Sequence, residues 1–77
     1  MSKLRYDLHA LSVFMKEKIR HLIARKIIEQ GEIKILIHNL ARNGGLTDQL
    51  QNQYLDRLNA LEEDIENLRK VLKILNE

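Results

Sequence analysis

Seven apolar residues in the second half of the chain are spaced alternately by four and three positions. This spacing keeps them on one side of an α-helix and is the heptad pattern by which helices pair. A half-buried strand would instead alternate at every second residue. The pattern therefore predicts a helix over residues 47–76 with one packing face. That face is made of Tyr54, Leu58, Leu61, Ile65, Leu68, Leu72 and Leu75.

A turn is predicted immediately before this helix. The chain has no Pro and three Gly, and two of the three stand together in Asn43-Gly44-Gly45. Gly tolerates the left-handed backbone that ends helices, and Asn tolerates it better than most residues. Thr47 is suited to cap the helix that follows, and Asp48 places a negative charge at its N-terminus. We therefore expect a turn over residues 43–46.

The first half carries a second apolar stripe at helical spacing, formed by Leu4, Leu8, Leu11, Met15, Ile19 and Leu22. The same line continues through the polar Lys26 and Gln30 to Ile33, Ile37 and Leu40. It predicts a helix over residues 3–42, which at 1.5 Å per residue would be roughly 60 Å long, against roughly 45 Å for the second helix. The longer helix should therefore overhang or fold back.

Gly31 leaves the course of the first helix open, because Gly inside a helix costs up to about 1 kcal/mol relative to Ala. A kink there is one alternative, and a break would give three helices over residues 3–30, 32–43 and 47–76. Ile33, Ile35 and Ile37 also alternate with other residues, as in a strand. The chain offers no second alternating run, so only another copy could supply the partner strand.

Composition excludes several classes of protein. Apolar residues make up 44% and charged residues 31%, which is typical of a folded domain, and residues 1–77 are expected to form a single helical domain. Without Cys there is no disulfide framework and no thiolate site. No stretch is long and apolar enough for a membrane span, and no secretory signal opens the chain. The expected location is cytoplasmic.

Neither an enzyme nor a metal site is predicted. His9, His21 and His38 lack the spacing of three or four residues that would place two ligands on one helix face. Ser2, Ser12 and Thr47 are the hydroxyl side chains apart from Tyr, and no nucleophile constellation surrounds them. We expect a protein without catalytic residues, metal or cofactor.

Charge is divided unevenly along the chain, although the net charge is only +2. Residues 1–45 carry nine Lys or Arg and four Asp or Glu, whereas residues 46–77 carry four and seven. This division suits two helices that neutralise each other. A basic ridge on the first helix also allows an alternative function, a small dimeric nucleic-acid-binding regulator that contacts phosphates. The ridge residues are Arg5, His9, Lys16, Arg20, Lys34 and His38, and its expected contacts are Arg5, Lys16, Arg20 and Lys34.

The charges beside the second stripe favour a parallel pairing of two copies of the second helix. In that arrangement Arg57 would face Glu62 and Asp64 would face Arg69. The other interpretation is that the second helix packs on the first half of the same chain and these charges are solvated.

The sequence predicts an all-α helical hairpin that assembles as an oligomeric coiled coil or four-helix bundle, because two helices alone bury little apolar surface. The expected function is protein–protein interaction, as a small oligomerisation, adaptor or co-chaperone-like module. The partner would be another copy or a helix of another protein. The expected interface residues are Leu8, Leu11, Met15, Ile19, Leu22, Tyr54, Leu58, Leu61, Ile65, Leu68, Leu72 and Leu75.

Overall fold

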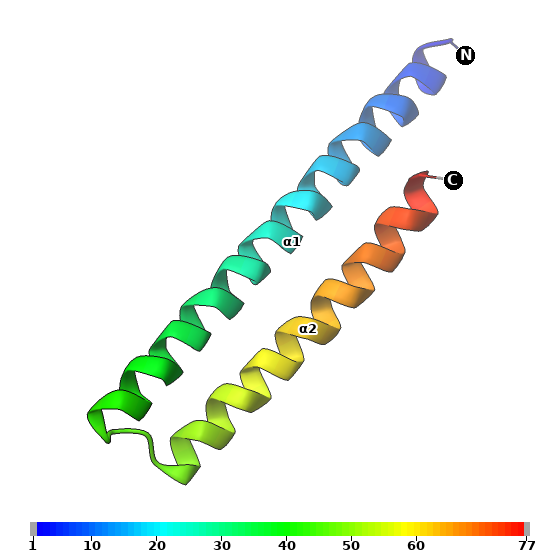
Figure 1. Ribbon diagram of the computed structural model, residues 1–77. Coiled ribbons are helices and arrows are strands. Elements are labelled where there is room, and N and C mark those ends of the chain that lie inside the picture. Colours follow the sequence, from blue (N-terminus) through cyan, green and yellow to red (C-terminus); the bar gives the residue numbers. More distant parts are fainter. Residues whose placement is uncertain (1, 77) are drawn as a thin grey trace.

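The chain forms an antiparallel pair of helices joined by one short turn (Figure 1). The computed structural model describes residues 2–76, with side chains from His9 onward. Helix α1 spans Ser2–Asn43 and α2 spans Asp48–Asn76. The molecule is a rod 64 Å long and 15 Å in each transverse direction. The all-α helical hairpin expected from the sequence is confirmed.

The turn uses the residues that the sequence marks for it. Gly44 adopts a left-handed φ of 73° directly after α1 ends. The Gly45 amide donates to the Leu40 carbonyl at 2.9 Å and the Gly44 amide to the Ala41 carbonyl at 3.4 Å, which together form a Schellman motif. At the start of α2, the Leu50 amide donates to the Thr47 hydroxyl at 3.1 Å. Thr47 is therefore the N-cap of α2, and the helix begins one residue after it.

Helix α1 runs through Gly31 without a break. Residues 33–37 lie within the same helix, so neither the three-helix alternative nor the strand alternative describes the chain. A Cβ atom at Gly31 would meet no atom within 4 Å outside the local helix backbone. Gly31 is thus not required by close packing within the hairpin.

The two helices bury few residues between them. Among the side chains from His9 to Asn76, Leu61 and Ile65 on α2 and Ile33 on α1 are buried. The remaining stripe residues of α2 are half-buried. The face of α1 that turns toward α2, which we call the inner face, consists of buried or half-buried residues spaced by threes and fours. They are Ser12, Lys16, Ile19, Ile23, Lys26, Gln30, Ile33, Ile37 and Leu40.

The inner face departs from the predicted stripe in the N-terminal half of α1. Leu11, Met15 and Leu22 are exposed by 53%, 43% and 36%, whereas the stripe placed them on the same line as Ile33. The reason is periodicity. A seven-residue repeat matched to α2 runs from Ile33 back through Lys26 and Ile19, whereas Leu11 and Leu22 precede Ile33 at intervals of eleven. The leucines therefore drift to one side of the inner face.

α1 also extends beyond the end of α2. It has 42 residues and α2 has 29, and the N-terminal end of α1 projects past the C-terminal end of α2 (Figure 1). The projection is about a dozen residues, or roughly 20 Å. No helix in the described part of the chain is long and apolar enough to cross a membrane.

Candidate interaction surface

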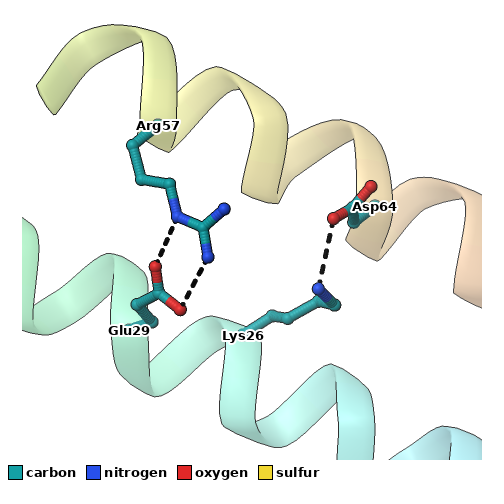
Figure 2. A network of polar contacts seen from close by, with 4 residues as sticks. All are labelled: Lys26, Glu29, Arg57 and Asp64. Atoms are coloured by element: carbon teal, nitrogen blue, oxygen red, sulfur yellow. Dashed lines mark hydrogen bonds and ion pairs between the residues drawn. The ribbon is translucent and has the colours of Figure 1, made fainter. Parts of the chain in front are cut away.

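Two ion pairs join the helices near the middle of the hairpin (Figure 2). Arg57 donates two hydrogen bonds to the Glu29 carboxylate, from Nε at 2.6 Å and from Nη2 at 3.1 Å. Lys26 Nζ lies 3.1 Å from Oδ2 of Asp64. The hydrogen bond from Arg57 lowers the pKa of the Glu29 carboxyl, and the same bond raises the pKa of Arg57. Both shifts favour the charged forms of the two side chains.

Lys26 and Gln30 are polar residues on the inner face, in the segment that lies opposite the buried part of α2. The Lys26 side chain is 27% exposed, and its ammonium reaches out to Asp64. The Gln30 amide donates to Oε2 of Glu62 at 2.9 Å. Long side chains can cover apolar surface with their stems while their polar ends remain in water. These two residues thus occupy packing positions without leaving buried polar atoms unpaired.

These contacts differ from the pairing that the charges of α2 indicate for a parallel dimer. Arg57 was expected to face Glu62, and Asp64 to face Arg69. In the hairpin, Arg57 instead binds Glu29 and Asp64 binds Lys26. The charges of α2 therefore support its antiparallel packing on α1.

The ion pairs define one edge of the hairpin, which we call the Arg57 edge. Residues seven apart on paired helices recur at the same position, so the Glu29–Arg57 contact fixes the position of two columns. The column on α1 is Met15, Leu22, Glu29 and Leu36, and the column on α2 is Leu50, Arg57, Asp64 and Val71. Leu50 is half-buried and the other apolar members are exposed. The edge is thus apolar toward both ends and charged in the middle.

A second row of residues flanks each column. On α1 each residue of this row comes four positions before a member of the column, and on α2 each comes three positions after one. On α1 the row is Leu11, Lys18, Arg25 and Glu32, and on α2 it is Gln53, Ala60, Asn67 and Ile74. A surface hollow of about 440 Å³ opens here, lined in part by Leu22, Arg25, Glu29 and Glu32. The hollow is an open depression between side chains of α1.

The predicted interface residues separate into two groups. The stripe of α2 and Ile19 face the other helix of the same chain and are buried or half-buried. Leu11, Met15 and Leu22 face outward on or beside the Arg57 edge, and the side chain of Leu8 lies outside the described residues. Leu36 is not among the interface residues predicted from the sequence, although it lies on this outward edge. The seven-residue spacing of Met15, Leu22, Glu29 and Leu36 is the signal that could have revealed it.

The basic ridge is divided by the same geometry. Lys16 is half-buried on the inner face, and Arg20 is bound to Glu17 at 2.9 Å. Arg20 and Lys34 lie fourteen residues apart on the edge opposite Arg57, where both are exposed. His9 and His38 are exposed, and the side chain of Arg5 is outside the described residues. The three expected phosphate contacts whose side chains are described, Lys16, Arg20 and Lys34, therefore do not form one uninterrupted surface.

No metal-binding group of three or more His, Cys, Asp or Glu occurs within the described residues. Comparison with family models, with curated proteins and with solved structures finds no match to this chain.

Proposed function

We propose that this chain is a non-enzymatic protein–protein interaction module that self-associates through the Arg57 edge. The observation that carries the proposal is the distribution of apolar surface. Between His9 and Asn76, twelve large apolar side chains are exposed and three are buried. A small helical hairpin gains little stability from so few buried residues, and association is the remaining way for it to cover apolar surface.

The Arg57 edge is favoured over the opposite edge by its composition. Five of its eight column positions are apolar. The corresponding columns of the opposite edge are Val13, Arg20, Ile27 and Lys34 on α1 and Leu55, Glu62, Arg69 and Asn76 on α2, where three of eight are apolar. Covering the Arg57 edge therefore removes more apolar surface from water than covering the opposite edge, and it buries fewer charged side chains.

The mass of the chain in solution tests self-association. We expect light scattering to give a multiple of the 9.1 kDa chain mass, and we expect the Tm to rise with protein concentration, since association stabilises the folded state by mass action. A helical monomer whose Tm is independent of concentration would overturn the proposal. A poorly folded monomer would overturn it too, because another protein would then have to cover these faces.

A matched pair of variants tests the choice of edge. Val71 and Leu55 are apolar residues of α2 exposed by 43% and 44%, on the Arg57 edge and the opposite edge respectively. Val71→Glu should lower the solution mass toward that of the monomer, because it places a carboxylate in the interface. Leu55→Glu should leave the mass unchanged. The reverse result would assign the interface to the opposite edge.

A further inference from the structure

The Arg57 edge carries a pattern along α1 that is complementary to itself when two copies run in opposite directions. Reading toward the turn, the edge and its flanking row present Met15, Lys18, Glu32 and Leu36. When α1 of a second copy is laid antiparallel across this line, Met15 meets Leu36 of the other chain and Lys18 meets its Glu32. The same register places Leu22 opposite Glu29 of the other chain. The contact between Met15 and Leu36 is centred between Arg25 and Lys26, and the contact between Lys18 and Glu32 is centred on Arg25.

Near that centre Arg25 comes close to its own copy, and this like-charge approach needs compensation. Glu29 lies four residues from Arg25 in each chain and brings a carboxylate within one helical turn, although both of its oxygens also bind Arg57. Its negative charge is therefore shared between the two arginines. The hollow lined by Leu22, Arg25, Glu29 and Glu32 gives these side chains room between the helices.

α2 carries a second self-complementary pattern. When it is laid antiparallel on its copy, Arg57 lies opposite Asp64 and Leu50 lies opposite Val71, with the small Ala60 beside the centre. Arg57 and Asp64 already bind Glu29 and Lys26 within each chain, so this contact joins the ion pairs of the two chains into one network. A small residue there lets two helices approach closely, and opposite charges placed on either side specify the register.

The two centres coincide in the hairpin. Glu29 of α1 lies beside Arg57 of α2, to which it is bound. The centre of the α1 pattern lies three to four residues before Glu29, and the centre of the α2 pattern lies three to four residues after Arg57. Because the helices are antiparallel, these displacements run in the same direction along the rod. One two-fold axis therefore satisfies both patterns at once, as an isologous interface requires.

We propose that the partner of the Arg57 edge is a second copy of this chain, with α1 against α1 and α2 against α2 and the turns at opposite ends of a four-helix bundle. This inference rests on the proposed self-association and adds its geometry. Four contacts each occur twice around the axis: Met15–Leu36, Lys18–Glu32, Arg57–Asp64 and Leu50–Val71. The arrangement leaves the opposite edge in solvent, with Val13, Arg20, Ile27 and Lys34 on α1.

The overhang of α1 favours this arrangement over the one with both turns at the same end. With the turns together, α1 lies along α2 of the other copy, which is shorter, so the projecting residues that carry Leu11 gain no neighbour from it. With the turns apart, α1 lies along another α1, and Leu11 reaches the C-terminal end of that helix. The arrangement with the turns at opposite ends therefore covers more of the exposed apolar surface than the arrangement with the turns together.

Cross-linking between single cysteines tests the geometry, because the natural chain has no Cys. Ala60→Cys places a thiol next to the axis, and we expect a short bis-maleimide to link it to its copy several-fold more than Glu63→Cys. Glu63 is the control because it is exposed and only three residues away, on the outer side of α2. In mixed samples, Met15→Cys should link to Leu36→Cys and not to Val71→Cys.

The outcomes separate this inference from the proposed function. Linking of Met15→Cys to Val71→Cys, with no linking of Ala60→Cys, would establish the arrangement with both turns together and overturn ours, although self-association would stand. Equal linking by Ala60→Cys and Glu63→Cys would also overturn ours. A monomeric mass for the natural chain would overturn the self-association on which the inference rests.

Discussion

The same substitution at two glycines should have opposite effects on stability. Gly31 lies inside α1, and a Cβ there meets no atom within 4 Å outside the local helix backbone. Ala is about 1 kcal/mol more favourable than Gly in a helix interior, so Gly31→Ala should raise the free energy of unfolding by about that amount. Gly44 has a φ of 73°, where an L-residue with a Cβ is disfavoured by about 1–2 kcal/mol. Gly44→Ala should lower the free energy of unfolding by about that amount.

The two variants have the same composition and should differ by about 2–3 kcal/mol. Urea unfolding followed by far-ultraviolet circular dichroism measures the difference, at one protein concentration because association contributes to stability. For a domain of this size each kcal/mol corresponds to about 4–8 °C in Tm. A loss of stability in Gly31→Ala would refute the continuous, unobstructed helix at this position. An unchanged stability in Gly44→Ala would refute the left-handed turn.

Three further predictions concern the helix interface. Leu61→Ala should cost about 2–4 kcal/mol in unfolding free energy because Leu61 is fully buried, whereas Ile35→Ala, at 63% exposure, should cost much less; similar losses in urea unfolding would contradict the assigned core. The pKa of Glu29 is lowered, so the stabilisation from its bond with Arg57 is complete above the ordinary value of 4.5 and is lost as the pH falls below that value. Glu29→Gln should therefore flatten a plot of Tm against pH in this acidic range. An unchanged slope would count against the bond. Lys26→Met keeps a long apolar stem on the inner face, whereas Lys26→Ala removes it, so the Met variant should have the higher Tm. The reverse order would show that Lys26 acts mainly through its charge.

The hairpin could be predicted from the sequence because its signals are local. The heptad spacing on α2 predicts a helix whatever that helix packs against. Asn43-Gly44-Gly45 predicts the end of the first helix, and Thr47 predicts the start of the second. The left-handed Gly44 and the capping hydroxyl of Thr47 realise both signals. Each depends on residues within a few positions of one another, where backbone preferences dominate.

The inner face of α1 could not be chosen in the same way. Two periodicities lead back from Ile33. The eleven-residue series passes through Leu22 and Leu11, whereas the seven-residue series passes through Lys26, Ile19 and Ser12. The choice depends on the register of α2, and the chosen face accepts the polar Lys26 and Gln30, which pair with Asp64 and Glu62. That selection is a tertiary effect and lies outside what spacing alone reveals.

Charge pairing was ambiguous for a related reason. Arg57 and Asp64 each have an acceptable partner in a parallel pair of α2 helices and another on an antiparallel α1. The sequence contains both sets of partners, and only the direction of the neighbouring helix distinguishes them. A short turn makes the antiparallel neighbour available within the same chain at a small entropic cost.

The short turn between α1 and α2 also has a kinetic consequence. Contacts next to the turn, such as those near Leu40, join residues close in sequence, whereas contacts near Ile19 close a loop several times longer. Because the entropic cost of closure grows with loop length, pairing should begin at the turn and proceed along the rod toward the termini. Unfolding should proceed in the reverse direction, and backbone amides near Leu72 should exchange with solvent before those near Leu58. A second chain that binds the end of the hairpin away from the turn would then act chiefly by slowing the first step of unfolding.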